Sequence, residues 1–251
     1  MIAFVREVAR SLSACELTYQ TREPIDAVRA ARQHRRYTRE LQHLGCELQW
    51  LPSLPEHPDG VFVEDTAILV PELAVVTRPG AESRRGEVES VAQALAQRLP
   101  LVRISAPATL EGGDVLRIER RVYVAVSGRS NAQGVEQLGA ALRPYGYEVH
   151  AVPLQGCLHL KSACTYIAPD LLLANPSWID PGLFAARRVI AVEESEPFAA
   201  NTLTVGGVTL VSEAYPLTRR RLEAAGVATR ALEVSELHKA EAALTCLSLL
   251  L

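Results

Sequence analysis

The chain has 251 residues, of which 48% are hydrophobic and 22% charged, so it can bury a large core. Its net charge of −3 and its lack of long basic blocks argue against nucleic acid as a partner. No apolar stretch approaches the roughly 20 residues of a membrane helix, and the amino terminus lacks a basic region followed by an apolar one. The five cysteines are scattered and odd in number, which predicts reduced thiols. We therefore expect a globular cytoplasmic protein without a membrane partner.

Strand-like runs alternate with amphipathic, helix-like runs along the chain, and no linker rich in serine, glycine or proline separates them. An order of strand, polar turn, helix and strand recurs, in whole or in part, in 27–52, 73–107, 122–153, 171–194 (a compressed copy) and 208–234. The two clearest copies begin about 50 residues apart, a period typical of repeated units that share one core. The sequence predicts a single repetitive α/β domain over residues 1–251. If the units close into a ring, their strand ends meet at one axis.

The stretch DGVFVED, residues 59–65, alternates like a strand and ends in two adjacent carboxylates, Glu64 and Asp65. Together with Asp59, these acids can surround a guanidinium or ammonium ion with charge-assisted hydrogen bonds. They can also hold a metal, although a hard divalent ion needs further oxygen ligands that the sequence does not obviously provide here. Solvated turn residues are the third interpretation.

The stretch LEGGDV, residues 110–115, carries paired glycines that allow a bulge or a close backbone approach. Glu111 and Asp114 would then project from an unusual local conformation. A plain β-turn explains the pattern nearly as well.

The stretch CLHLKSACTY, residues 157–166, places Cys157 and His159 on one face of an expected strand. The histidine is either a core residue or a catalyst. Cys157, His159 and Cys164 could instead bind zinc, but their spacing does not match the usual structural sites and no fourth ligand is evident. We therefore expect no metal.

Two arginines hold equivalent positions in successive copies. Arg84 begins the helix after TRPGAES, and Arg129 follows AVSG. Two equivalent turns that each offer a guanidinium suit a carboxylate ligand. Two ordinary surface arginines are the alternative.

The carboxyl-terminal tail ALTCLSLLL alternates as expected of a strand and contains Cys246. Packing is the first interpretation of this thiol, because free cysteine is among the most buried residue types. The cysteine nevertheless shares its strand face with Ser248, and a half-polar face at the end of a sheet also suits the wall of a site.

Taken in order, six motifs resemble the dimethylarginine dimethylaminohydrolases of the guanidine-modifying, or pentein, superfamily: VFVED, TRPGAESRRGE, EGGDV, GRSNAQG, LHLKSACTYI and LTCLS. The resemblance runs along nearly the whole chain. It implies a five-fold pseudosymmetric α/β propeller of ββαβ units, in agreement with the repeats. It further implies hydrolysis of Nω-methylated L-arginine to L-citrulline and methylamine or dimethylamine, without a cofactor, by a protein that forms a homodimer.

Residue by residue, the resemblance implies that Cys246 is the nucleophile, His159 the general acid and base, and Glu111 the carboxylate that orients the histidine. The implied substrate-binding residues are the acids Asp59, Glu64 and Asp65, Arg84 and Arg129 for the α-carboxylate, the carbonyl of Ala240 for the α-ammonium, Leu17 in a lid, and Phe62.

The chain departs from the family pattern in two places. Glu241-Ala242-Ala243 stands where relatives often carry Asp-Gly-Gly, which concerns the α-amine contact at Ala240, and the lid stretch 13–26 also differs. Both departures affect the choice of substrate more than the chemistry.

Two other functions are open at this point. One is a reaction on unmethylated or otherwise substituted arginine, including amidino transfer to an amine. Arginine deiminases of this superfamily are typically longer and carry a helical insertion, for which this chain has no room. The other is a catalytically silent arginine-binding protein, against which the retained Cys246, His159 and Glu111 argue, because binding arginine needs no thiol.

Overall fold

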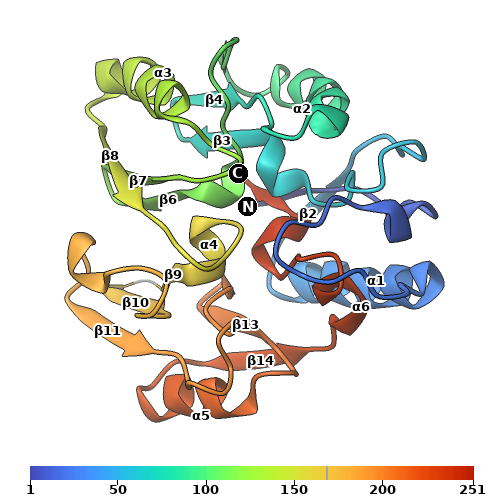
Figure 1. Cartoon of the computed structure of the whole chain (residues 1–251), viewed down its shortest axis with the longest axis vertical. Helices are drawn as coiled ribbons and strands as arrows, with labels where there is room; N and C mark the ends of the chain where they lie inside the picture. Colours follow the sequence, from blue (N-terminus) through green and yellow to red (C-terminus); the bar gives the residue numbers. More distant parts are fainter. Residues whose placement is uncertain (168) are drawn as a thin grey trace.

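The computed structural model describes residues 1–167 and 169–251, which form five three-stranded sheets around a central axis (Figure 1). We call each sheet with its connecting segment a blade. The strands of the five blades are β1 (Ile2–Val5), β2 (Glu47–Trp50) and β15 (Leu249–Leu250); β3 (Ala67–Val70), β4 (Leu73–Val76) and β5 (Leu101–Arg103); β6 (Val115–Ile118), β7 (Arg121–Val126) and β8 (Glu148–Pro153); β9 (Cys164–Ile167), β10 (Leu171–Ala174) and β11 (Arg188–Ala191); and β12 (Leu203–Val205), β13 (Val208–Ser212) and β14 (Thr229–Leu232).

The blades share one pairing pattern. In the second to fifth blades, the first two strands pair antiparallel and the third strand runs parallel to the second. A parallel pair needs a crossover connection. Three blades use α2 (Val88–Leu95), α3 (Ala132–Leu142) and α5 (Pro216–Ala224) for it, and the fourth uses a single 3₁₀ turn, η6 (Pro181–Leu183). The predicted propeller of ββαβ units, with its compressed fourth copy, is confirmed.

The first blade closes the ring with strands from both ends of the chain. β1 pairs antiparallel with β15, where Ala3 lies opposite Leu250 and Phe4 opposite Leu249, and parallel with β2 after the crossover helix α1 (Ala27–His43). Both termini therefore lie near the axis (Figure 1). This closure carries the segment before β15, which contains Cys246, to the centre of the molecule.

The hydrophobic core is divided into clusters between neighbouring blades. Val75 of β4 packs in one cluster with Val124 of β7 and Leu138 of α3, which joins the second and third blades. Leu116 of β6 and Leu172 of β10 belong to another cluster, which joins the third and fourth. Each fully buried side chain of this size contributes about 1.5–3 kcal/mol. The blades are thus held to their neighbours by the same kind of packing that holds one blade together.

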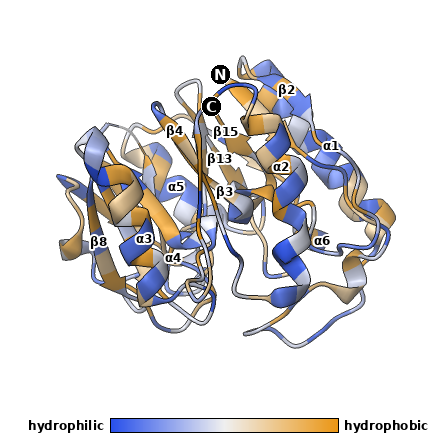
Figure 2. Ribbon diagram, turned by 90° about the horizontal axis from the view of Figure 1, so that it is seen from above, coloured by the Kyte–Doolittle hydropathy of each residue, from blue (hydrophilic) through white to orange (hydrophobic). Residues whose placement is uncertain are grey.

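The crossover helices are amphipathic, as packing on one side of a sheet requires. Helix α1 buries Tyr37 and Leu41, and its first turn is capped by Asp26, whose carboxylate accepts the N–H groups of Val28 and Arg29. In Figure 2, α1 and α2 carry both hydrophilic and hydrophobic residues, whereas the strands are mainly hydrophobic. Within the described ranges, no helix is both long and apolar enough to cross a bilayer.

Short helical turns precede the strands β3, β6, β9 and β15. They are η2 (Val63–Thr66), η4 (Gly112–Asp114), α4 (Leu160–Ala163) and η7 (Thr245–Leu247). The sequence predicted a bulge or turn at η4 and continuous strands at the other three. The strands predicted at 59–65, around His159 and along the carboxyl-terminal tail are therefore wrong in these parts, and only Leu249–Leu250 of the tail is a strand. All four residues of η2 are buried. The alternation in this stretch therefore results from burial and does not indicate a strand.

Candidate active site

Residues far apart in sequence meet in one cavity, to which η2, η7, the residue before α4 and the segments that follow β4 and β7 all contribute. Of the residues predicted from the sequence, eight line this cavity: Asp59, Phe62, Asp65, Arg84, Arg129, His159, Ala240 and Cys246. The cavity wall is completed by Glu16, Leu158, Glu241 and Ala242. The thiol of Cys246 and the imidazole of His159 therefore share a cavity.

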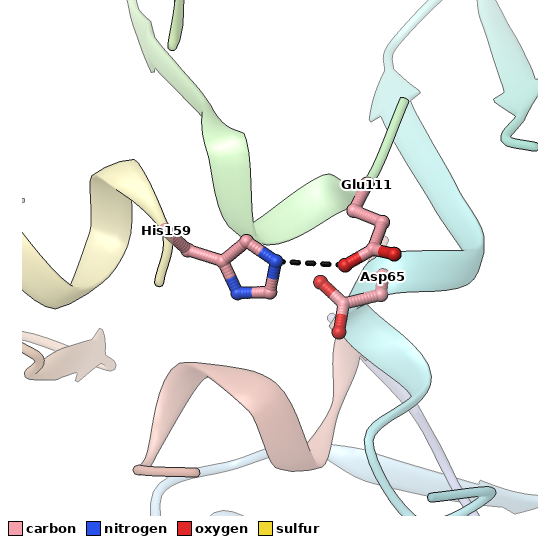
Figure 3. Close-up of side chains that lie close together, drawn as sticks. All are labelled: Asp65, Glu111 and His159. Atoms are coloured by element: carbon pink, nitrogen blue, oxygen red, sulfur yellow. Dashed lines mark hydrogen bonds and ion pairs between the residues drawn. The ribbon is translucent and has the colours of Figure 1, made fainter. Parts of the chain in front are cut away.

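Glu111 fixes the imidazole of His159. It precedes η4 and is fully buried, and its Oε2 lies 2.7 Å from His159 Nε2 (Figure 3). Its other oxygen accepts the N–H of Gly80 at 3.0 Å. Gly113 leaves room for the ring, because a Cβ at that position would stand 2.6 Å from His159 Nδ1. Nε2 is thus engaged with the carboxylate, and Nδ1 is the nitrogen left for proton exchange.

The charge of His159 is set by the acids around it. Burial alone would lower the pKa of the imidazole, but Asp65, Asp114 and Glu111 outweigh burial and raise the pKa to about 9. His159 is therefore protonated in the ligand-free protein at neutral pH. A protonated histidine can donate a proton to a departing amine.

Asp65 and Arg84 form a buried ion pair beneath the cavity. Arg84 donates to Asp65 Oδ2 at 2.7 Å, to Glu87, and to the carbonyl of Phe62, so that most of its N–H groups are used within the protein. Burial by itself would raise the pKa of Asp65, yet the charges of His159 and Arg84 lower it to about 2. Asp65 thus stays ionised and ready to hold a cation.

Cys246 lies in η7 and is half-buried. The N–H of Ala243 points at its sulfur, with a nitrogen–sulfur distance of 3.5 Å. Burial, together with the charges of Glu64 and Asp65, raises the pKa of the thiol to about 12. The ligand-free protein therefore carries a neutral thiol, and a cation bound beside it would favour the thiolate.

Asp59 and Arg129 stand on the walls of the cavity and contact the amino-terminal loop. Burial raises the pKa of Asp59 to about 6, and its Oδ2 accepts the N–H of Glu16 at 3.1 Å. Arg129 donates to Thr18 Oγ1 at 3.1 Å and lies 3.6 Å from Glu111 Oε1. Arg129 has more free N–H groups than Arg84 with which to bind a carboxylate.

Three predicted site residues do not line the cavity. Glu111 lies behind His159, and Leu17 packs against the core cluster between the fifth and first blades. Glu64 faces a separate cavity, and its oxygens accept from Lys161 Nζ at 2.7 Å and from Thr245 Oγ1 at 2.6 Å. The two neighbouring acids of the VFVED motif therefore line different cavities: Asp65 lines the cavity that contains Cys246, and Glu64 lines the other one.

Sequence reasoning did not assign three residues that support the site. Asp114 accepts the N–H of Leu160 at 3.1 Å and so holds the turn that carries His159. Asn201 pairs with Thr245 through two hydrogen bonds of 3.0 Å each and holds the turn that carries Cys246. Lys161 neutralises Glu64. Asp114 was visible in its motif, but the partners of Asn201 and Lys161 lie too far away in sequence to be recognised.

Metal binding can be judged from the donor groups. Cys157 and Cys164, considered above as zinc ligands, are packed in the hydrophobic cluster between the third and fourth blades. Within residues 1–167 and 169–251, one group has metal-ligand spacing: atoms of Asp65, Glu111 and His159 lie within 4.8 Å of one another (Figure 3). These atoms already have partners inside the protein, since Glu111 holds His159 and Arg84 holds Asp65.

A five-bladed α/β propeller that gathers a cysteine, a histidine and carboxylates at its axis defines the protein as a pentein, a member of the guanidine-modifying superfamily. The N-terminal domain of ArgZ, an arginine dihydrolase from cyanobacteria, shows the same fold, with a TM-score of 0.89 at 19% identity over 99% of this chain and 96% of that one.

Closer relatives narrow the class. The family model of eukaryotic N,N dimethylarginine dimethylhydrolase matches residues 12–207. The N(G),N(G)-dimethylarginine dimethylaminohydrolase of Streptomyces coelicolor is 37% identical over 98% of this chain and 95% of its own. That of Pseudomonas aeruginosa is 34% identical over 89% of each chain. A cysteine-to-serine variant of the Pseudomonas enzyme, complexed with citrulline, superimposes with a TM-score of 0.93 over 98% of this chain and 97% of that one.

The chain belongs to the dimethylarginine dimethylaminohydrolase family, and it is a hydrolase of the class that acts on the carbon–nitrogen bonds of linear amidines.

Proposed function

We propose that the protein hydrolyses Nω-methylated L-arginine to L-citrulline and methylamine or dimethylamine, with Cys246 as nucleophile. The observation that carries the proposal is the shared cavity of Cys246 and His159, in which ionised Asp65 and Asp59 face the same space. The relatives named above as dimethylarginine dimethylaminohydrolases support this choice of substrate.

The acids bind one end of the substrate and the arginines bind the other. Asp65 and Asp59 hold the guanidinium nitrogens, because a carboxylate pairs with a planar cation through charge-assisted hydrogen bonds. Arg129 binds the α-carboxylate, and Arg84 adds its remaining N–H. The carbonyl of Ala240 accepts from the α-ammonium.

Other residues enclose the bound substrate. Phe62 packs on the aliphatic part, and Leu17 belongs to the amino-terminal loop that closes over the bound substrate. Glu64 lies behind Thr245, and its negative charge acts on the bound cation from there.

The thiolate forms when substrate binds. Because the pKa of Cys246 is raised to about 12 in the ligand-free site, the positive guanidinium is what favours the charged sulfur. His159 is already protonated and cannot accept the thiol proton, so that proton leaves to solvent. The site then holds a thiolate, a guanidinium and an imidazolium together.

Two half-reactions follow. The sulfur of Cys246 forms a bond to the guanidinium carbon, and as the carbon–nitrogen bond breaks, His159 transfers its proton to the departing methylamine or dimethylamine. This leaves a covalent thiouronium and a neutral imidazole. His159 then removes a proton from water, and the oxygen attacks the same carbon. As the carbon–sulfur bond breaks, the remaining proton of that oxygen passes to the departing sulfur, which releases citrulline and regenerates the thiol of Cys246. The sequence of steps requires neither a metal nor an organic cofactor.

Trapping tests the covalent step. Acid quench during turnover of asymmetric dimethylarginine, followed by mass spectrometry of the peptide that contains Cys246, is expected to reveal the thiouronium adduct. Cys246→Ser is expected to bind the substrate without forming citrulline. Full turnover by this variant would contradict the proposal.

A substrate panel tests the choice of guanidine. Citrulline release is measured with arginine, monomethylarginine and asymmetric dimethylarginine, and the methylated compounds are expected to have the higher kcat/KM. A preference for unmethylated arginine would identify a deiminase. No citrulline from any compound, with binding intact, would identify an arginine-binding protein.

A further inference from the structure

Glu241 is held in an unusual backbone conformation at the edge of the catalytic cavity. Its φ is +55°, a left-handed value that residues other than glycine, asparagine and aspartate rarely adopt. It also lines the cavity that contains Cys246 and His159. Strained backbone of this kind persists where surrounding contacts hold it in place, and it is concentrated at functional sites.

The carboxylate of Glu241 contacts the amino-terminal loop. It accepts the backbone N–H of Thr18 at 2.9 Å, and it also accepts those of Tyr19 and Gln20. Three successive N–H groups that converge on one anion form a backbone nest. Residues 16–20 belong to no helix or strand, so these contacts contribute much of what orders the loop.

Two further contacts of this loop involve substrate-binding residues of the proposed function, and another joins Glu16 to Ser83, whose hydroxyl donates to its carboxylate. The N–H of Glu16 donates to Asp59 Oδ2, and Thr18 Oγ1 accepts from Arg129. Glu16 itself lines the cavity. The loop therefore borders the cavity, and it contacts the two side chains, Asp59 and Arg129, that we assign to the guanidinium and the α-carboxylate.

We infer that Glu241 is a positioning residue for substrate binding, which anchors residues 16–20 over the cavity through its carboxylate. The effect on catalysis rests on the proposed function, whereas the effect on the loop does not. Glu241 also connects the loop to the chain segment that leads from Ala240 to Cys246, so that closure of the loop and alignment of the binding groups depend on one side chain.

The loop can be tested without any substrate. Hydrogen exchange of the amides of residues 18–20 is followed by mass spectrometry in the wild type and in Glu241→Gln, which keeps the size of the side chain and removes its charge. Hydrogen bonds to a charged acceptor are strong, so exchange at these amides is expected to rise about tenfold or more. Glu136→Gln, which changes an exposed residue of α3, is the matched control and is expected to exchange like the wild type.

Two further variants separate the carboxylate from the backbone. Glu241→Asp keeps the charge and is expected to retain most of the protection, whereas Glu241→Gly relieves the left-handed strain but removes the carboxylate and is expected to lose it. Unchanged exchange in both Glu241→Gln and Glu241→Gly would overturn the inference.

Kinetics tests the consequence for binding. Glu241 touches the loop and not the reacting atoms, so Glu241→Gln is expected to raise KM about tenfold while kcat changes less than about threefold. Recovery of the wild-type KM in Glu241→Asp would support the role. A fall in kcat at unchanged KM would contradict a positioning role in binding. If the wild type turned over no guanidine at all, the proposed function would fail, while the exchange result would still decide whether Glu241 anchors the loop.

Discussion

His159 Nε2 lies 2.7 Å from Glu111 Oε2, and both side chains are almost completely shielded from water. They come from turns in neighbouring blades, so this contact orients the imidazole across a blade boundary. A shielded carboxylate stabilises the imidazolium far more than a solvated one would, because little water screens the pair. The contact therefore sets both the direction of the ring and its protonation state.

Glu111→Gln is expected to lower the pKa of His159, because the variant replaces a charged partner with a neutral one. With the imidazole less often protonated at neutral pH, the departing amine loses its proton donor, and kcat is expected to fall about 100-fold or more. The pH dependence of kcat and the NMR titration of His159 measure the two effects. A titration of His159 that is identical in variant and wild type would refute the assignment.

His159 also predicts how stability depends on pH. Its pKa is about 9 when folded and about 6.5 when unfolded, so the protonated ring stabilises the fold fully below pH 6.5, and this contribution is lost as pH rises to about 9. The loss amounts to about 3 kcal/mol. Asp59 and Asp114, with pKa values of about 6, titrate below this window, whereas the five cysteines, whose pKa values are raised by burial, lower the stability near the top of the window, because unfolded thiols ionise at about 8.5.

Urea unfolding between pH 6.5 and 9 measures this contribution. The free energy of unfolding of the wild type is expected to fall across the window. His159→Asn has no titrating ring and is expected to give a shallower profile, which falls only near pH 9 as the unfolded thiols ionise. Parallel profiles for the two proteins would show that another group is responsible.

The architecture was predictable because hydrophobic strands and amphipathic helices leave periodic patterns that repeat along the chain. Even the shortened fourth copy kept this order, although its crossover is only the turn Pro181–Leu183. Three of the turns that precede β3, β6, β9 and β15 were mistaken for strands, and in Val63–Thr66 the burial of all four side chains hides the helical period. In a 3₁₀ turn, successive side chains diverge by about 120°, which explains why Glu64 and Asp65 face separate cavities.

The site was predictable as a set of residues but not as a network. The equivalent positions of Arg84 and Arg129 suggested equal roles, yet Arg84 is largely engaged by Asp65 and Glu87. The orientation of side chains within the second blade decides which N–H groups of Arg84 remain free, and a single sequence contains no record of such orientations. The same holds for Glu241, whose partners lie more than 200 residues away.

Gly113 is expected to be indispensable for the geometry of His159. In Gly113→Ala the new Cβ would stand 2.6 Å from His159 Nδ1 and 2.9 Å from Asp65 Oδ1, so the ring must shift. Because small misplacements of catalytic groups are costly, kcat is expected to fall about 100-fold. Gly128→Ala is the control, since its Cβ would meet nothing within 4 Å. Steady-state kinetics of both variants, with circular dichroism to verify folding, tests this, and equal activities would show that the imidazole tolerates the crowding.

Lys161 is expected to matter for stability through Glu64. Lys161→Met would leave the carboxylate of Glu64 without its cation, and the side chain of Glu64 is only 8% exposed. Breaking a fully buried ion pair costs about 3–5 kcal/mol. Lys161 is 20% exposed, so water offsets part of the loss, and we expect about 2 kcal/mol.

The double variant Lys161→Met with Glu64→Gln removes both charges while an amide oxygen still accepts from Thr245, and it is expected to recover most of the lost stability. Urea unfolding of the two single variants and the double variant completes a mutant cycle. Strictly additive losses would mean that the two charges act independently. A coupling of the expected sign would mean instead that Lys161 serves chiefly to neutralise Glu64, the acid behind the turn that carries Cys246.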